Sequence, residues 1–267
     1  MKQITSARCI SCIPEVVPKK RSNNKKLKLL ITNKRIDWGF KQSMLMIQSR
    51  LQQIMRRTGD KVLLITSTIP AEGKTMTSVN MALAFAQEGM KVALLDGDLR
   101  KPSVSELMKL PEGPGLTEYF RGESTPEEIQ VVKDGVTFFR AGQKKGKVSG
   151  LIDEEKMNSL LEKLRKEYDV ILMDAAPSYV FSDAMILSSY ADKVLYVVRV
   201  DKADAKEIRV GMNSFEEKEK LIGYVINRDT GGYISQSGYG YGRYGKYQKY
   251  RKYAELDEET MNTEDTL

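Results

Sequence analysis

The stretch Lys61-Val-Leu-Leu-Ile-Thr-Ser-Thr-Ile-Pro-Ala-Glu-Gly-Lys-Thr75 decides how this chain folds. It begins as a continuous apolar run with the length of a buried strand, and it ends in a Gly-Lys-Thr turn that opens a helical pattern. Gly73 lets the backbone approach phosphate oxygens, and the following helix N-terminus offers free N–H groups. The stretch therefore predicts a phosphate-binding loop between a strand over 61–67 and a helix over 74–88.

The residue types in this loop indicate that the bound phosphates belong to ATP with Mg²⁺. Lys74 has the length and charge to reach the β- and γ-phosphates, and the Thr75 hydroxyl can ligate Mg²⁺. The loop departs from the pattern G-x-x-x-x-G-K-[ST] at its first position, which is Thr68. We expect the nucleotide contacts to come from Pro70, Ala71, Glu72, Gly73, Lys74, Thr75 and Met76.

Outside the loop, short apolar runs alternate with segments of helical spacing. We expect strands over 61–67, 91–96, 136–140, 169–174, 192–199 and 221–227. We expect helices over 36–57, 74–88, 153–167, 182–190 and 204–218, with loop and short helix over 102–135. Runs that are continuous rather than alternating are typical of strands buried on both faces. The pattern predicts an α/β fold with an open, mostly parallel sheet and helices on both faces.

Three carboxylates stand where predicted strands end. Asp96 and Asp98 follow one strand, and Asp174 ends another. The carboxyl ends of parallel strands lie along one edge of a sheet, which is also the edge of the phosphate-binding loop. We therefore expect the three carboxylates and Lys74 to converge on the γ-phosphate, an arrangement that suits Mg²⁺ binding and activation of a hydroxyl group or water.

Three segments resemble the Walker A, Walker A′ and Walker B motifs of bacterial tyrosine kinases, the co-polymerase-associated kinases of capsule and exopolysaccharide synthesis. They are Thr66-Ser-Thr-Ile-Pro-Ala-Glu-Gly-Lys-Thr75, Leu95-Asp-Gly-Asp-Leu-Arg-Lys-Pro102 and Val170-Ile-Leu-Met-Asp-Ala-Ala-Pro177. The resemblance covers roughly residues 37–253. It implies a P-loop NTPase fold similar to MinD and ParA, and an ATP-dependent protein-tyrosine kinase.

The resemblance also implies a role for each matching residue at the phosphates. Lys74 and Thr75 would hold the phosphates and Mg²⁺. Asp98 and Asp174 would support the metal, so that Thr75, Asp98 and Asp174 form the expected metal set. Asp96 would orient or deprotonate the incoming tyrosine.

Four further residues match positions around these motifs. Arg100 would lie near the phosphates or the acceptor, and Asp183 matches a recurrent family position. Asn227 and Arg228, at the end of the last predicted strand, would lie near the adenine.

The chain departs from its relatives at three places. Partition and division-site ATPases carry an added lysine in the P-loop where this chain has Ile69, which favours the kinase branch. The helix before the P-loop lacks the pattern E-x-x-R-x-x-R that helps related kinases to form rings, so a homo-oligomer is expected without a defined ring. Walker B usually has a hydroxyl residue after its Asp, and Ala175 at this position implies the loss of a supporting hydrogen bond.

A tyrosine-rich segment near the C-terminus supplies an independent indication. Seven of the 13 tyrosines fall within residues 233–253, among Gly, Lys, Arg, Gln and Ser rather than apolar residues. Such a segment is either a low-complexity tail, a basic and aromatic RNA-binding segment, or a cluster of autophosphorylation sites. The resemblance favours the last, with phosphoacceptors Tyr239, Tyr241, Tyr244, Tyr247, Tyr250 and Tyr253.

Charge and composition divide the chain into a basic N-terminal extension with little structure (1–35), a kinase domain (36–230) and a flexible tail (231–267). The first 35 residues carry ten Lys or Arg and one acid, and residues 233–253 carry five and none. Because this basicity belongs to the ends, we expect no specific nucleic-acid groove. The N-terminal arm is either a solvated face or attracted to an anionic membrane or an acidic partner.

Composition sets the remaining expectations. The chain has no histidine, so a Cys₂His₂ zinc site and Ser-His-Asp catalysis are excluded, and the lone C-x-x-C of Cys9 and Cys12 is interpreted as incidental. No apolar run is long enough to span a bilayer, which predicts a cytoplasmic protein recruited to the inner membrane face. The resemblance implies a membrane-embedded activator of the polysaccharide co-polymerase type and a cognate tyrosine phosphatase. The alternatives are a MinD/ParA-like ATPase switch and a nucleic-acid-binding ATPase.

Overall fold

The computed structural model describes residues 5–16, 29–143 and 150–230. Contacts divide the chain into two units, Met1–Arg228 and Asp229–Leu267, and the fold below is that of the first. Its strands are β1 (Cys9–Pro14), β2 (Val62–Ser67), β3 (Val92–Asp96), β4 (Gln130–Lys133), β5 (Val136–Phe139), β6 (Val170–Asp174), β7 (Lys193–Arg199) and β8 (Leu221–Asp229). Its helices are α1 (Trp38–Thr58), α2 (Lys74–Gln87), α3 (Val104–Met108), α4 (Leu116–Arg121), α5 (Glu154–Glu167), α6 (Asp183–Tyr190) and α7 (Ala205–Glu216).

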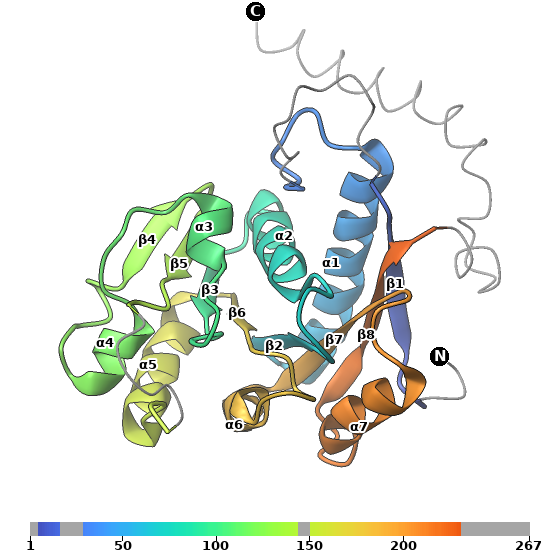
Figure 1. The fold of residues 1–267 in the computed structure, drawn as a ribbon. Helices are drawn as coiled ribbons and strands as arrows, with labels where there is room; N and C mark the ends of the chain where they lie inside the picture. Colours follow the sequence, from blue (N-terminus) through green and yellow to red (C-terminus); the bar gives the residue numbers. More distant parts are fainter. Residues whose placement is uncertain (1–4, 17–28, 144–149, 231–267) are drawn as a thin grey trace, which may run out of the picture. The chain divides into compact units, whose positions relative to one another are not determined.

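The strands form one eight-stranded sheet in the order β1-β8-β7-β2-β6-β3-β5-β4 (Figure 1). β2 pairs in parallel with both β6 and β7, and the pairs β3–β6, β3–β5 and β7–β8 are also parallel. Only β4 and β5 form an antiparallel pair among the registers that are defined. The predicted fold class, an open and mostly parallel sheet with helices, is confirmed.

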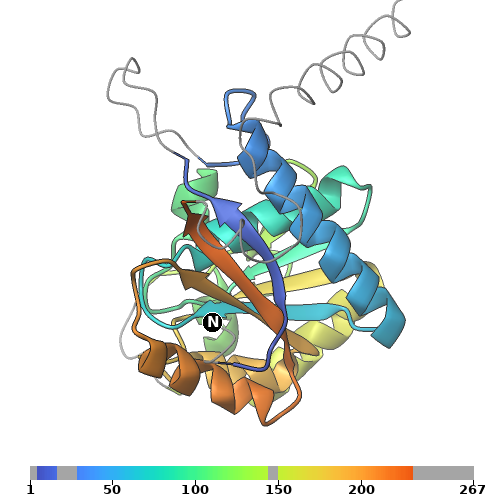
Figure 2. The same ribbon diagram turned by 90° about the vertical axis from the view of Figure 1, so that its right-hand side faces the viewer.

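Both faces of the sheet are covered, as the continuous apolar strands predicted. Along β2, Leu63 and Ile65 pack on one face, whereas Val62 and Leu64 pack on the other. Helices α1, α2 and α3 cover the first face, and α4, α5, α6 and α7 cover the second. Figure 2 shows this layering at the β1 and β8 edge, with α1 and α7 on opposite sides of the strands. Every residue of β2 is buried, which explains the absence of alternation in its sequence.

The expectation of little structure across residues 1–35 is wrong for Cys9–Pro14. These residues form β1, which lies next to β8 at the edge of the sheet, and the Tyr224 N–H donates to Arg8 O at 2.9 Å. Ile10 and Ile13 are fully buried in the same cluster as α1. The strand was missed because its apolar residues are few. It is stabilised by covering the apolar face of α1, a helix that is distant in sequence. The basic residues 19–28 lie outside the described residues.

A second strand was also missed. Gln130–Lys133 was expected to be loop, but it forms β4, an edge strand antiparallel to β5. None of its four residues is buried, and Val132 is 73% exposed, so the segment lacks the apolar run that marks the other strands. The predicted tail and its tyrosines, together with residues 144–149, lie outside the described residues.

Candidate active site

The predicted phosphate-binding loop joins β2 to α2 at the carboxyl edge of the sheet. Gly73 is the N-cap of α2 and has a φ of 97°, in the left-handed region that glycine tolerates. A Cβ atom at this position would lie 2.1 Å from Asn227 Nδ2, so a side chain is excluded by space as well as by φ. Ala71 also has a positive φ, of 68°. The loop therefore turns tightly and exposes backbone rather than a side chain at Gly73, as an anion site requires.

Glu72 braces this loop from inside. Its side chain is fully buried, and its carboxylate accepts hydrogen bonds from Ile69 N–H at 2.8 Å and from Arg199 N–H at 3.2 Å. Its carbonyl oxygen accepts from Asn227 Nδ2 at 2.7 Å. Burial raises the pKa of Glu72, and the hydrogen bonds to backbone N–H groups oppose that rise. One residue thus ties the loop to the ends of β7 and β8.

Lys74 lies at the centre of the predicted carboxylates. Its Nζ is 2.7 Å from Asp98 Oδ2 and 3.3 Å from Asp174 Oδ2, and its side chain is almost entirely buried. Burial by itself lowers the pKa of Lys74, but the charges of Asp174 and Asp98 raise it above the usual value. The lysine is therefore held as a cation where the phosphates of a nucleotide would approach.

Asp174 is held on both of its oxygens. Thr75 Oγ1 donates to Oδ2 at 2.6 Å, and Ser78 Oγ donates to Oδ1 at 2.9 Å. Burial raises the pKa of Asp174, although Lys74 and the two hydroxyl groups oppose the rise. Ser78 was not among the predicted site residues. Its position one helical turn after Lys74 places both on one face of α2, a signal that could have identified it.

Asp96 lies directly opposite Asp174 in the register of β3 and β6. It is fully buried, and its Oδ2 accepts from Val104 N–H at 3.2 Å. Its Oδ1 has no hydrogen-bond partner among the described residues. Burial and the nearby Asp174 raise the pKa of Asp96 well above the usual value. A carboxylate of this kind has the basicity, and an oxygen without a hydrogen-bond partner, to accept a proton from a hydroxyl group.

The donors at this edge fit Mg²⁺. The predicted set of Thr75, Asp98 and Asp174 consists of hard oxygen ligands, which Mg²⁺ prefers. Within the described ranges, no three His, Cys, Asp or Glu side chains form a group that could hold a metal by themselves. Mg²⁺ in nucleotide sites takes one or two carboxylates and completes its shell with phosphate oxygens and water. The donor set therefore suits a metal that enters with a nucleotide.

Arg100 forms an ion pair with Asp183 of the same chain. Its guanidinium donates to both carboxylate oxygens of Asp183, with the Nη2–Oδ1 contact at 3.0 Å, and it lies over the Phe181 ring at 4.5 Å. The expectation that Arg100 lies near the phosphates or the acceptor stays a prediction. The structure does join it to Asp183, the other family position in this region.

Asn227 and Arg228 lie on the opposite side of the loop, at the end of β8. Asn227 Nδ2 donates a hydrogen bond to the Glu72 carbonyl oxygen, and Asn227 Oδ1 accepts one from Arg228 N–H at 2.9 Å. The Arg228 guanidinium is 3.8 Å from Glu15, just after β1. Their contact with adenine stays a prediction, whereas the loop-supporting role of Asn227 is a contact that sequence reasoning missed.

The fold and this arrangement define a P-loop nucleotide-binding protein. A family model described as "ParA: NUBPL iron-transfer P-loop NTPase" matches residues 59–206. The cell division ATPase MinD of Pyrococcus furiosus shares the fold, with a TM-score of 0.55 and 23% identity over 63% of this chain and 72% of that one.

Kinases match over more of the chain. The tyrosine-protein kinase CpsD of Streptococcus pneumoniae is 34% identical over 184 residues, which are 64% of this chain and 78% of the relative. The kinase domain of the Escherichia coli tyrosine kinase ETK has a TM-score of 0.74 at 26% identity, covering 83% of this chain and 90% of that one. This chain belongs to the bacterial tyrosine kinases, as the three motifs predicted.

Relatives in this family differ in length. The tyrosine-protein kinase ptk of Acinetobacter johnsonii is 28% identical over 180 residues, which are 65% of this chain but only 25% of the relative. The chain thus spans a quarter of that protein, whereas it spans most of CpsD. No helix in the described part of the chain is both long and apolar enough to cross a membrane.

Proposed function

We propose that this chain transfers the γ-phosphoryl group of ATP to tyrosine hydroxyl groups. The observation that carries the proposal is the position of Lys74 Nζ, 2.7 Å from Asp98 and 3.3 Å from Asp174, on a P-loop beside the fully buried Asp96. Each group has a use in phosphoryl transfer, where catalysis consists mainly of positioning and charge stabilisation. The family to which the chain belongs supports the same reaction.

In the proposed reaction, the tyrosine Oη attacks the γ-phosphorus of ATP. The bond from Oη to phosphorus forms as the bond from phosphorus to the β,γ-bridging oxygen breaks, and ADP leaves. Asp96, with its raised pKa and an Oδ1 that has no hydrogen-bond partner among the described residues, takes the phenolic proton. Lys74 stabilises the charge on the phosphates, and Gly73 and its neighbours in the P-loop orient them. Bound Mg²⁺, held by Thr75, Asp98 and Asp174, would supply further charge neutralisation.

The proposed acceptors are tyrosines of the chain itself. The candidates are Tyr239, Tyr241, Tyr244, Tyr247, Tyr250 and Tyr253. Each phosphate adds a charge of about −1.5 to −2, so three or four would reverse the positive charge of residues 233–253. We propose transfer in trans, between copies of the chain, because repulsion of the phosphorylated segment would then release one copy from another.

We further propose a role in capsular or exopolysaccharide synthesis at the membrane. Relatives include a "putative tyrosine-protein kinase in cps region" of Klebsiella pneumoniae and a "putative tyrosine-protein kinase EpsB" of Ralstonia solanacearum. The activator would be a membrane-embedded protein of the polysaccharide co-polymerase type, acting through a cytoplasmic segment, and a tyrosine phosphatase would reverse the modification. The chain would then work in the cytoplasm at the inner membrane face, as a homo-oligomer.

The test is the intact mass of the purified protein after incubation with Mg·ATP. Wild type is compared with Lys74→Met and with a chain that ends at Gly232. We expect added phosphates on wild type and none on either variant. Mixing Lys74→Met with the shortened chain should restore phosphate on the Lys74→Met tail if transfer occurs in trans. ATP hydrolysis without phosphate on any chain, with an activator segment present, would instead support an ATPase switch.

A further inference from the structure

The Lys74 ammonium contacts one oxygen of each predicted metal ligand. Its Nζ lies 2.7 Å from Asp98 Oδ2, 3.2 Å from Thr75 Oγ1 and 3.3 Å from Asp174 Oδ2. A lysine ammonium has three N–H donors, so these three contacts match its full hydrogen-bonding capacity. The lysine side chain is only 11% exposed. It is therefore enclosed by the same oxygens that the predicted metal set assigns to Mg²⁺.

These contacts use the lone pairs that a metal ion would need. Asp174 Oδ2 accepts two hydrogen bonds, from Thr75 Oγ1 at 2.6 Å and from Lys74 Nζ, so both of its lone-pair sites are in use. Thr75 Oγ1 donates its single hydrogen to Asp174 and accepts from Lys74. Two cations that share the same buried oxygens repel each other strongly, because water screens them little. The ammonium and Mg²⁺ therefore compete for this set of ligands.

The two carboxylates are also held by contacts that do not involve Lys74. Ser78 Oγ donates to Asp174 Oδ1 at 2.9 Å, and Lys101 N–H donates to Asp98 Oδ1 at 3.0 Å. In each carboxylate one oxygen is thus fixed by the surrounding fold, while the other oxygen faces the lysine. Removal of the ammonium should therefore leave the carboxylates in position and free the oxygens that face it.

We propose that Lys74 excludes Mg²⁺ from these ligands until a nucleotide binds, and that the phosphates then draw the ammonium away and leave the oxygens to the metal. The inference rests on the proposed function, from which it takes the metal ligands and the phosphate site. Lysine has a flexible four-carbon stem, and phosphate oxygens are strong acceptors for its N–H groups. Binding of the metal and binding of the nucleotide then strengthen each other, and the metal does not bind by itself.

The experiment measures Mn²⁺ binding to the full-length chain without nucleotide, by the electron paramagnetic resonance of the free ion. Mn²⁺ takes the same oxygen ligands as Mg²⁺. We expect Lys74→Met to bind Mn²⁺ at least about tenfold more tightly than wild type, because it lacks the positive charge that contacts the ligands. Adding Asp98→Asn to Lys74→Met should remove this gain. Every chain compared carries the same acidic residues in 254–267, so the differences between chains report the site.

Lys61→Met is the matched control. Lys61 is also a partly buried lysine, but it precedes β2, at the end of the strand opposite the P-loop. Its Nζ donates to the carbonyl oxygens of Arg165 at 2.8 Å and Tyr168 at 3.1 Å rather than to a predicted metal ligand. This variant should bind Mn²⁺ as wild type does. Equal affinity in wild type and Lys74→Met, or an equal gain in Lys61→Met, would overturn the inference.

A second measurement uses wild type alone and does not depend on the folding of Lys74→Met. At constant ionic strength, MgCl₂ by itself should leave the thermal unfolding midpoint unchanged, whereas MgCl₂ with ADP should raise it by more than ADP alone does. A rise with MgCl₂ alone that equals the rise with both would overturn the inference while the proposed kinase stands. Neither measurement involves phosphoryl transfer, so a chain that binds metal as expected but phosphorylates nothing overturns only the proposed function. A wild type that binds neither ADP nor metal overturns both.

Discussion

Ser78 Oγ donates a hydrogen bond to Asp174 Oδ1 at 2.9 Å, across the gap between helix α2 and strand β6. Together with Thr75 on the other oxygen, it orients the buried carboxylate that the family pattern assigns to the metal. The hydroxyl that Walker B usually carries after its Asp is missing at Ala175, yet both oxygens of Asp174 have hydroxyl partners. The support for this carboxylate comes from the P-loop helix.

Ser78→Ala should therefore slow tyrosine phosphorylation about tenfold, because a hydrogen bond to a charged group is worth roughly 1.5–3 kcal/mol. The loss should fall on kcat rather than on the KM for ATP, since Ser78 orients Asp174, and its other contact, to the Lys74 carbonyl oxygen at 3.0 Å, is with an acceptor inside α2 and not with a loop N–H group. The rate of phosphate incorporation by intact mass, measured against ATP concentration, separates the two. Thr77→Val is the matched control, because Thr77 Oγ1 is buried on the same helix without a hydrogen bond among the described residues. Equal losses in both variants would argue against this role of Ser78.

Gly73→Ala should abolish nucleotide binding, because the new Cβ would meet Asn227 Nδ2 at 2.1 Å at a φ of 97°. Gly89→Ala is the control, with a similar φ of 77° but nothing within 4 Å of the added atom. Its cost should be limited to backbone strain of about 1 kcal/mol in the free energy of unfolding. Titration with a fluorescent ADP analogue and urea unfolding measure the two effects. Tight ADP binding by Gly73→Ala would show that the loop relaxes without loss of the site.

Asp192→Ala should lower the free energy of unfolding by about 2–3 kcal/mol. The carboxylate accepts from Lys61 N–H and Val62 N–H at 2.8 Å and pairs with Arg165 at 2.6 Å, so its loss leaves the start of β2 without these acceptors. Urea denaturation at pH 7 measures the change. Glu127→Ala, which removes only an ion pair between exposed side chains, should have no measurable effect.

The contribution of Asp192 should also depend on pH. Burial raises the pKa of Asp192, but Arg165 and the two backbone N–H groups outweigh it and hold the pKa below the usual value. The stabilisation is therefore fully present above the unfolded value of about 3.9 and is lost as the pH falls through the lower folded value. The difference in stability between wild type and Asp192→Ala should be constant from pH 7 to 5 and shrink below about pH 4. A difference that grows in acid would contradict this assignment.

Chelation of Mg²⁺ should suppress tyrosine phosphorylation by about a hundredfold or more. The metal would neutralise charge in the transition state and so lower its free energy by several kcal/mol. Intact mass after incubation with ATP and EDTA tests this, and excess Mg²⁺ should restore the phosphates. Asp174→Asn should be inactive with Mg²⁺ present but keep the same thermal unfolding midpoint within a few degrees. Full phosphorylation in EDTA would remove the metal from the proposal.

Much of the fold followed from local pattern. The strand that leads into the P-loop, its helix and the strands before Asp96 and Asp174 lie within two residues of their predicted bounds. Buried parallel strands can be recognised in the sequence as continuous apolar runs. Because such strands end at a common edge of the sheet, Lys74, Asp98 and Asp174 could be predicted to converge there. The two missed strands, β1 and β4, lie at the edges of the sheet, where one-sided pairing requires fewer apolar residues.

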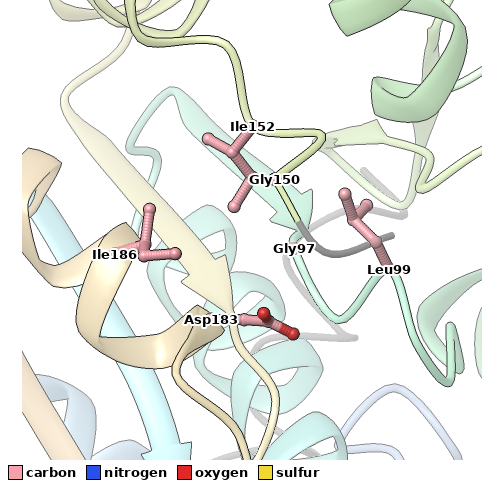
Figure 3. A pocket seen from close by; sticks show the side chains of 6 residues that line it. All are labelled: Gly97, Leu99, Gly150, Ile152, Asp183 and Ile186. Atoms are coloured by element: carbon pink, nitrogen blue, oxygen red, sulfur yellow. The ribbon is translucent and has the colours of Figure 1, made fainter. Parts of the chain in front are cut away.

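The sequence by itself determined the α/β class, the P-loop and the family, because each depends on residues that are adjacent or regularly spaced along the chain. Only the tertiary structure decided how the side chains are paired. Arg100 with Asp183, Ser78 with Asp174, and Glu72 with the N–H of Arg199 join residues about 80 to 130 positions apart. A small pocket lined by Gly97, Ile152 and Ile186, among others, is likewise built from three separate segments (Figure 3). Periodicity states which face of an element is buried, whereas the partner of each buried polar group depends on how the elements pack in space.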